Sequence, residues 1–225
     1  MTRPTYIIDF DSTMVTVESL EELASLALAG RTDRESVLNQ VELICNQGMS
    51  GEIGFDESLN RRLKLFQANR QHVDELIEQL LGSISPSALA NLEWFRRNRA
   101  DIYVLSGAFI DWVAPITKRL GLRDDHVFAN RLIYNEKDDI VGYDRNCLLS
   151  QPLGKAKQAA ALSLPQPVIV IGDGYTDYEI RTYGAAQAFW AFAETVQRPE
   201  LFALADRVLF SFDGVQDVQL SPNAR

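Results

Sequence analysis

The chain has 225 residues and a formal net charge of −9, and 46% of its residues are hydrophobic. This length can bury one sizeable core, or one core with an inserted lid, but hardly two independent α/β domains. The acidic balance argues against nucleic acid as a partner, because nucleic-acid phosphates require a basic surface. It does not argue against small phosphorylated molecules, whose binding depends on local charges.

The sequence also lacks a membrane span, a signal peptide and a cysteine-rich metal motif. No stretch approaches the ~20 apolar residues of a membrane span, and the N-terminus leads into a strand pattern rather than a signal peptide. Cys45 and Cys147 have no metal-site spacing around them, so both are expected to be free thiols. We therefore expect a cytoplasmic protein without a membrane partner, whose oligomeric state the sequence leaves open.

Four short apolar runs, each followed by turn residues, predict buried parallel strands separated by helices. They cover residues 6–8, 102–105, 168–171 and, more weakly, 186–192. Residues 127–134 and 140–143 flank a polar segment and predict a β-hairpin. The expected fold class is α/β, with a doubly wound, Rossmann-like parallel sheet.

The segment between the first two strands is far longer than the ~30 residues of a simple βαβ unit, so most of it must lie outside the sheet. Its apolar residues recur with helical spacing. We predict a helical cap at residues 18–82, and an α/β core formed by 1–17 and 83–225. Residues 19–22 and 32–35 have the pattern of capping boxes. Three glycines at 48, 51 and 54 would let part of the cap reshape as it closes.

Asp9 and Asp11 stand two residues apart where the first predicted strand ends. This arrangement suits chemistry on phosphate, because one carboxylate can attack phosphorus while the other protonates the leaving oxygen and later deprotonates a water. The first carboxylate can also help to hold a hard cation. An Asp in this place can alternatively cap the next helix, so the interpretation depends on the segments that accompany the pair.

Two further segments supply groups for holding a phosphate. Ser106 and Gly107 follow the second strand and offer a hydroxyl and backbone amides. Gly154-Lys155 opens a helical stretch and offers one cation that could neutralise the nucleophile and the developing phosphoryl charge. Taken alone, the first could be a plain turn and the second a solvated surface lysine.

Asp173 and Asp177 lie in the segment that follows the third strand, between Gly172 and the start of a helix. A bare turn needs glycines but not this pair of carboxylates. Asp173 emerges where Mg²⁺ would need a second oxygen ligand, and Asp177 can orient metal-bound water or the lysine. Because the carboxyl ends of parallel strands meet at one edge of a sheet, all these groups are expected to converge there.

Other motif interpretations are excluded on physical grounds. Gly172-Asp173-Gly174 lacks the third glycine of a dinucleotide fingerprint, and its carboxylates would repel a pyrophosphate. Gly154-Lys155 lacks the upstream glycine and the following Ser or Thr of a P-loop. The segment ending in Ser106-Gly107 lacks the leading glycine of a nucleophile elbow.

Together these segments resemble the haloacid-dehalogenase superfamily of phosphotransferases, over roughly residues 6–212, and within it the phosphoserine phosphatase group. The segments that carry the resemblance are Asp9-Phe10-Asp11-Ser12-Thr13 with Glu18, Met49-x-Gly51-x-x-x-Phe55-x-x-Ser58-Leu59-x-x-Arg62, Ser106-Gly107-Ala108-Phe109, Phe128-Ala129-Asn130-Arg131-Leu132, Gly154-Lys155 and Gly172–Asp177. Three positions depart from the group pattern. Tyr175 is larger than the usual Ala, Ala108 stands where Gly is common, and Thr176 replaces an Asn found in many members, although Thr also occurs there.

The resemblance implies a Mg²⁺-dependent phosphomonoesterase that forms an aspartyl-phosphate on Asp9. Asp11 would serve as acid and then base, and the implied phosphate-binding residues are Ser106, Gly107, Lys155 and Thr176. It implies that Mg²⁺ is bound by the Asp9 side chain, the Asp11 backbone carbonyl and Asp173, with Asp177 in the surrounding shell.

The resemblance also implies O-phosphoserine as the substrate and a role in serine biosynthesis. Glu18 would face the substrate ammonium and Arg62 its carboxylate, with Met49 and Phe55 beside them. Glu18 and Arg62 could instead be ordinary helix-surface charges, and the adjacent Arg61 leaves the register open by one. The alternative functions are a related lidded phosphatase acting on phosphocholine, phosphohomoserine or a methionine-salvage sugar phosphate, and a retired module that only binds its ligand.

Overall fold

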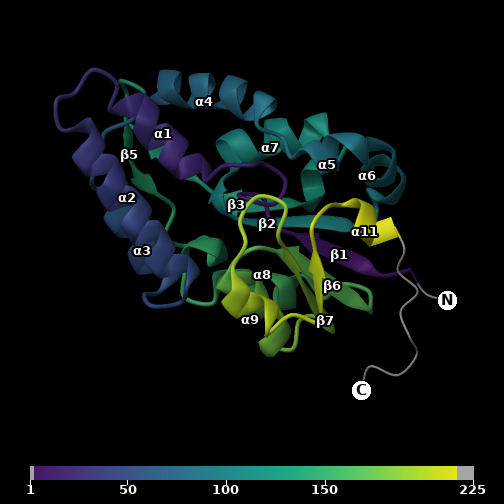
Figure 1. Ribbon diagram of the computed structural model, residues 1–225. Coiled ribbons are helices and arrows are strands. Elements are labelled where there is room, and N and C mark those ends of the chain that lie inside the picture. Colours follow the sequence, from purple (N-terminus) through teal and green to yellow (C-terminus); the bar gives the residue numbers. More distant parts are fainter. Residues whose placement is uncertain (1–2, 217–225) are drawn as a thin grey trace.

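The computed structural model describes residues 3–216, which form a six-stranded parallel sheet with helices on both faces (Figure 1). The strand order is β3-β2-β1-β6-β7-β8. The strands are β1 (Thr5–Ile8), β2 (Ile102–Phe109), β3 (Val127–Asn130), β6 (Val168–Gly172), β7 (Ala188–Phe192) and β8 (Arg207–Leu209). The predicted α/β class with a doubly wound parallel sheet is therefore confirmed.

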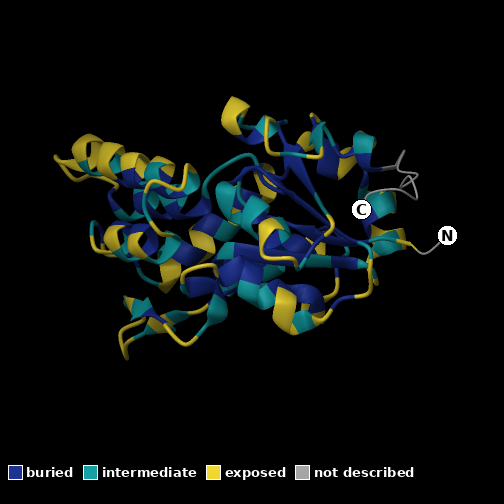
Figure 2. Cartoon of the chain, turned by 90° about the horizontal axis from the view of Figure 1, so that it is seen from below, coloured by how far each residue is buried: buried dark blue, intermediate teal, exposed yellow. Residues whose placement is uncertain are grey.

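The strands are continuous apolar runs because both faces of the sheet are covered, and their side chains alternate between two packed layers. One layer joins the face of Ile8 and Val104 to α5 (Pro86–Ala90), α6 (Leu92–Asn98), α7 (Ile110–Arg119) and α11 (Asp213–Gln216). The opposite layer joins Ile7 and Val170 to α8 (Gly154–Leu162), α9 (Tyr175–Thr182) and α10 (Pro199–Phe202). Figure 2 shows the resulting buried centre between more exposed outer helices.

β1 lies at the point where the sheet order reverses, with β2 on one side and β6 on the other. Ligands of open α/β sheets bind at such a point, beyond the carboxyl ends of the strands. The backbone N–H of Asp9 donates to the carbonyl of Ile171 at 2.9 Å, so Asp9 extends the β1–β6 ladder by one residue. The fold thus places the first carboxylate at the expected edge.

The structure differs from the sequence-based strand assignment at the sheet edges. Residues 127–130 belong to the main sheet as β3, and only β4 (Leu132–Tyr134) and β5 (Ile140–Tyr143) form the antiparallel hairpin. β8 was not predicted, since a strand of three residues is too short to show a recognisable apolar pattern. β2 runs on through Ser106 and Gly107 to Phe109, with an irregularity in its pairing to β3 between Leu105 and Phe109.

Four helices follow β1 before the chain returns to the sheet: α1 (Ser19–Ala27), α2 (Arg34–Met49), α3 (Phe55–Leu63) and α4 (Arg70–Gly82). The outgoing and returning chains lie side by side, joined by the bridge between Val15 and Ile84. α4 packs on α7, and the buried residues of α1, α3 and α4 belong to the same apolar cluster as one sheet face.

The two predicted capping boxes are wrong. α1 begins after Glu18 and α2 after Asp33, and neither N-cap side chain accepts a capping hydrogen bond. The Ser19 hydroxyl instead accepts a hydrogen bond from the indole N–H of Trp112 at 2.9 Å. A capping box does occur at α4, between Asn69 and His72. Among residues 3–216, no helix is both long enough and apolar enough to cross a bilayer.

Candidate active site

Asp9 is buried beside the amine of Lys155, with 2.7 Å between its Oδ1 atom and Nζ. The same oxygen accepts the backbone N–H of Phe10 at 2.7 Å. After this residue the chain turns tightly, with Ser12 in the left-handed region at φ 51°. The backbone thus fixes the Asp9 carboxylate at the end of β1, with one oxygen already held by a cation.

Lys155 lies between two carboxylates, because its Nζ also contacts Asp177 Oδ1 at 2.8 Å. Burial alone would lower the pKa of Lys155, but Asp177 and Asp9 outweigh burial and raise that pKa above its ordinary value. Burial and the Asp9 charge raise the pKa of Asp177 to about 7, against the lowering effect of Lys155. A Cβ at Gly172 would collide with the Asp177 carboxyl, so this close approach requires glycine.

Asp9, Asp173 and Asp177 offer carboxylate oxygens within 4.8 Å of one another, and all three residues are buried. Asp173 Oδ1 has no hydrogen-bond partner, while Oδ2 faces Arg198 Nε and Nη2 at 3.4 Å each. Burial, followed by the charges of Glu18 and Asp9, raises the pKa of Asp173 well above its ordinary value. Three buried carboxylates with an unpartnered oxygen are suited to a hard divalent cation, which would offset their mutual repulsion.

Asp11 is half-buried at the start of the loop that leads into α1. Its Oδ1 accepts the backbone N–H of Ser19 at 3.1 Å. Burial, followed by the charge of Glu18, raises the pKa of Asp11 well above its ordinary value, although the hydrogen bond from Ser19 opposes the shift. A carboxyl group that retains its proton in this way can donate it to a leaving oxygen.

Ser106 and Gly107 lie in the last part of β2. The Ser106 hydroxyl is buried and accepts the backbone N–H of Ala108 at 3.0 Å, which leaves its own hydrogen for a ligand. The Gly107 carbonyl accepts the side-chain N–H of Asn130 at 2.8 Å. A Cβ at Gly107 would collide with the ring of Phe55, so glycine lets α3 approach this strand closely.

One cavity of about 460 Å³, counting space open to solvent, collects most of the predicted site. Asp173 and Asp177 do not line it, but each has a carboxylate oxygen within 4.8 Å of one of Asp9. Of the predicted residues, those lining it are Asp9, Asp11, Glu18, Met49, Phe55, Arg62, Ser106, Gly107, Lys155 and Thr176. On one side of the cavity, the end of β1 and the start of α8 provide Asp9 and Lys155. On the other side, the segment between β1 and β2 provides Glu18, Phe55 and Arg62.

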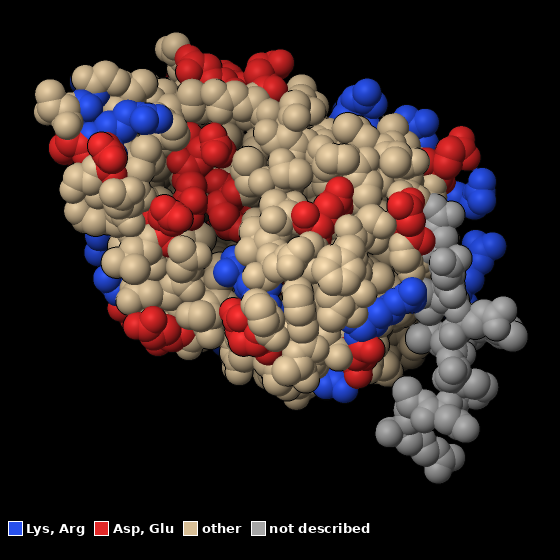
Figure 3. Space-filling view, in the orientation of Figure 1, with Lys and Arg blue, Asp and Glu red and all other residues tan. Residues whose placement is uncertain are grey.

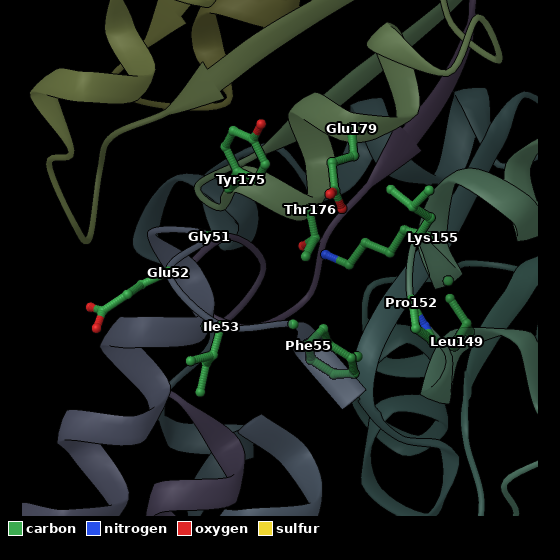
Figure 4. Close-up of a pocket in the computed structure, with 15 residues that line it drawn as sticks. Gly51, Glu52, Ile53, Phe55, Leu149, Pro152, Lys155, Tyr175, Thr176 and Glu179 are labelled. Atoms are coloured by element: carbon green, nitrogen blue, oxygen red, sulfur yellow. The ribbon is translucent and has the colours of Figure 1, made fainter. Parts of the chain in front are cut away.

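A second cavity, of about 730 Å³, adjoins the first and shares Phe55, Gly107, Lys155 and Thr176 with it. Figure 4 shows the amine of Lys155 next to Thr176 on one side, and Tyr175 and Ile53 further from it. This second cavity lies where the turn after α2 faces the first residues of α9. Tyr175, which is larger than the Ala usual in the phosphoserine phosphatase group, therefore borders this second cavity. The first cavity, of about 460 Å³, is called the reaction cavity below.

Glu18 and Arg62 both face the reaction cavity but make different contacts. Glu18 Oε1 accepts the hydroxyl of Ser12 at 2.7 Å. Arg62 is only 6% exposed, its Nε has no hydrogen-bond partner, and no ion pair involves it within residues 3–216. Arg61 is exposed and pairs with Glu57 at 3.4 Å, so the buried cation of α3 is Arg62.

Two residues of this region carried no signal that sequence reasoning recognised. Arg198 precedes α10 and contacts the Asp173 carboxylate, from a loop without a motif. Cys45 lies on α2, and its Sγ is 3.3 Å from Arg62 Nη1 and 3.6 Å from Glu18 Oε2. Its position on the buried face of α2 follows from helical spacing, but that spacing does not reveal its contacts with Glu18, which precedes α1, and with Arg62 on α3.

The geometry agrees with comparisons to known proteins. Residues 7–180 match the family model of haloacid dehalogenase-like hydrolases. The chain belongs to this family. The chloroplastic phosphoserine phosphatase of Arabidopsis thaliana is 31% identical to this haloacid dehalogenase-like hydrolase over 210 residues, which are 92% of this chain and 68% of the plant protein.

Two solved structures resemble the hydrolase over nearly its whole length. A phosphoserine phosphohydrolase-like protein from Francisella tularensis has a TM-score of 0.85 at 27% identity, covering 95% of this chain and 98% of its own. A phospho-aspartyl intermediate analogue of phosphoserine phosphatase has a TM-score of 0.74 at 25% identity, covering 96% and 98%. The similarity therefore includes both the sheet and the four inserted helices.

Proposed function

We propose that this haloacid dehalogenase-like hydrolase converts O-phosphoserine to serine and phosphate through an aspartyl-phosphate on Asp9. The observation that carries the proposal is that one cavity holds Asp9 together with the oppositely charged Glu18 and Arg62. The relatives named above support the same substrate, and a role in serine biosynthesis would follow from it. The expected cytoplasmic location stays a prediction.

In the proposed mechanism, Asp9 attacks phosphorus in line and the bond from phosphorus to the serine oxygen breaks. Asp11 gives its proton to that oxygen, because an alkoxide is a poor leaving group. The Asp11 carboxylate then removes a proton from water, which attacks the aspartyl-phosphate and releases inorganic phosphate. Lys155, Ser106, the Gly107 amide and Thr176 would hold the phosphate oxygens in both steps.

We further propose Mg²⁺ as the cation for the carboxylate cluster, held by the side chains of Asp9 and Asp173 and the backbone carbonyl of Asp11. Asp177 would orient the water molecules around the cation and the amine of Lys155. The bound cation would neutralise charge on the transferring phosphoryl group and reduce its repulsion by the acidic site. The unpartnered Asp173 Oδ1 is the feature of the site that best fits this role.

Substrate selection rests on Glu18 and Arg62. A buried guanidinium with an unpartnered Nε suits a carboxylate, which it can bind with two parallel hydrogen bonds. Glu18 would face the ammonium, and Met49 and Phe55 would enclose the carbon atoms between the charges. Phosphocholine has no carboxylate and would leave Arg62 buried without a partner, so the geometry favours an amino-acid ester.

We propose that residues 18–82 act as the cap and that the α/β core comprises 1–17 and 83–225. Glu18, Met49, Phe55 and Arg62 reach the cavity from this inserted segment, whereas the nucleophile and the lysine belong to the core. Closure of the cap would exclude bulk water until the phosphoenzyme has formed.

The deciding experiment is a screen of phosphate esters with the purified protein and Mg²⁺. Phosphoserine is expected to give a higher kcat/KM than phosphocholine, phosphohomoserine or p-nitrophenyl phosphate. Asp9→Asn serves as the control for a contaminating phosphatase. Preference for another ester would replace the substrate assignment, and lack of turnover with every ester would favour a retired binding module.

A further inference from the structure

Cys45 lies between the two charges that face the proposed substrate. It is 3% exposed, on the side of α2 that packs toward α1 and α3. Arg62 Nη1 donates to its sulfur at 3.3 Å, and the thiol donates to Glu18 Oε2 at 3.6 Å. The thiol is therefore the shared neighbour of a cation on α3 and of an anion that directly precedes α1.

Opposite charges that share a buried cavity would ordinarily form an ion pair, because their attraction strengthens as water is excluded. Within residues 3–216 no ion pair joins Glu18 to Arg62, and the sulfur lies between them. A Glu18–Arg62 pair would neutralise both groups and compete with a ligand. The interposed side chain leaves each charge available to the cavity.

The chemistry of a thiol suits this position. Sulfur is a weak hydrogen-bond acceptor and S–H a weak donor, so a ligand with stronger groups can replace these contacts at little cost. Burial raises the pKa of the Cys45 thiol above its ordinary value, and Glu18 and Glu21 add to this effect against the opposing charge of Arg62. Cys45 is therefore a neutral spacer rather than a thiolate that would hold Arg62 permanently.

We propose that Cys45 is a positioning residue that keeps Glu18 and Arg62 apart, so that an α-ammonium and an α-carboxylate can bind between them. This inference rests on the proposed function and extends it to a residue that does not touch the phosphate. It assigns to Cys45 part of the preference for amino-acid phosphate esters over esters without these two charges.

The test compares kcat/KM for phosphoserine with kcat/KM for p-nitrophenyl phosphate, which has neither an ammonium nor an α-carboxylate. In Cys45→Ala, the ratio of the two values is expected to fall about tenfold, because without the sulfur's two hydrogen bonds Glu18 and Arg62 can pair with each other and compete with the substrate. The fall should come mainly from a higher KM for phosphoserine. Cys45→Ser keeps a donor and an acceptor and is expected to retain most of the ratio.

Cys147→Ala is the matched control, because Cys147 is the other free cysteine and its Sγ donates to the Ala129 carbonyl, at 3.7 Å, rather than to a charged side chain. Thermal melting reports whether each variant folds. If Cys45→Ala does not fold, Cys45→Val gives the same measurement, since valine fills the thiol's space without a hydrogen-bonding group and should lower the ratio.

Three outcomes would overturn the inference. An unchanged ratio in Cys45→Ala or Cys45→Val would show that the thiol does not position the charges. Equal losses on both esters, or equal losses in Cys45→Ser and Cys45→Val, would show a role in packing only. A wild-type enzyme that does not hydrolyse phosphoserine would overturn the proposed function as well. If the wild type hydrolyses phosphoserine and only the variants behave as above, this inference alone fails.

Discussion

Two buried cations of the site differ in their partners. Lys155 contacts the carboxylates of Asp9 and Asp177 at 2.7 and 2.8 Å, so its charge is balanced within the protein and fixes the nucleophile. Within residues 3–216, Arg62 has no ion pair, and the acceptor of its side-chain hydrogen bond is the Cys45 sulfur. A buried charge without such a partner is costly unless a ligand supplies one. We therefore expect substitutions of Lys155 or Asp9 to affect the turnover of all substrates. Substitutions of Arg62 should affect only substrates that carry a carboxylate.

Asp9→Asn is expected to abolish turnover and leave the fold intact, because it removes a nucleophilic oxygen with almost no change in volume. Loss of the nucleophile should reduce kcat to below about 1% of the wild-type value. Steady-state kinetics with phosphoserine and p-nitrophenyl phosphate measure this, with circular dichroism as the test of folding. Activity above that level in folded protein would exclude Asp9 as the nucleophile.

Arg62→Ala is expected to cost roughly 2–4 kcal/mol of transition-state binding for phosphoserine, as for the loss of one partner of a buried charge pair. Turnover of p-nitrophenyl phosphate should change far less, since it has no carboxylate to lose. Arg61→Ala is the matched control, because Arg61 is exposed and its i,i+4 pair with Glu57 contributes little. Equal losses on both esters in Arg62→Ala would mean that Arg62 supports the fold rather than the substrate.

The inserted helices contact the core unevenly. α4 packs on α7, and the chain before α4 is joined to the β4–β5 hairpin by the bridge between Asn69 and Asp139. Arg70 reinforces this join, with its guanidinium 3.9 Å from the Tyr134 ring centroid and 3.2 Å from Asp138 Oδ1. α3 instead meets the core at the reaction cavity, where the Phe55 ring lies against Gly107. Motion of the cap is therefore expected at α2 and α3 rather than at α4.

Gly107→Ala is expected to lower kcat/KM for phosphoserine and p-nitrophenyl phosphate alike. The added Cβ would collide with the Phe55 ring and displace α3 from the cavity. A displacement of about 1 Å can cost about 10²-fold in rate.

Gly82→Ala is the control for this change, since a Cβ there meets no atom within 4 Å. Stopped-flow or steady-state assays of both variants measure the difference. Wild-type activity in folded Gly107→Ala would mean that the approach of Phe55 to β2 is not required for turnover.

The molecule as a whole is acidic, and its charges are not spread evenly. Figure 3 shows Asp and Glu side chains gathered in a hollow on the face in view, whereas Lys and Arg are scattered without a continuous basic stripe. The buried cluster of Asp9, Asp173 and Asp177 adds to this negative field inside the protein. An acidic interior of this kind should bind a divalent cation and gain stability from it.

Activity is therefore expected to disappear with a chelator, to return with Mg²⁺ and to weaken when Ca²⁺ competes, since Ca²⁺ prefers a larger and looser oxygen shell. At a hundredfold excess over Kd, Mg²⁺ should add about 2.7 kcal/mol to the free energy of unfolding, or roughly 5–10 °C in Tm. Asp173→Asn should raise the Mg²⁺ concentration needed for both effects. Full activity in chelator, or a Tm that Mg²⁺ does not change, would contradict a metal in this cluster.

The α/β class and the central strands could be predicted from the sequence alone, because a strand buried on both faces must be apolar throughout. The sequence also indicated residues of the candidate site, since Asp9, Ser106, Lys155 and Asp173 lie in or beside elements whose ends the local pattern marks. Of these four, Asp9, Ser106 and Lys155 line the cavity. Edge strands were less predictable. β3 and β8 are short, and whether a short segment such as 127–130 joins the main sheet or a hairpin depends on neighbours far away in sequence.

Which charges are buried, and what they contact, depends on tertiary packing. Arg61 and Arg62 are adjacent and chemically identical, but consecutive helical residues point about 100° apart. The packing of α3 against α2 buries one and leaves the other exposed. Cys45 and Arg198 became recognisable as parts of the site through contacts that span 17 and 25 positions along the chain. Such contacts depend on how helices and loops pack, so a local pattern of residues cannot predict them.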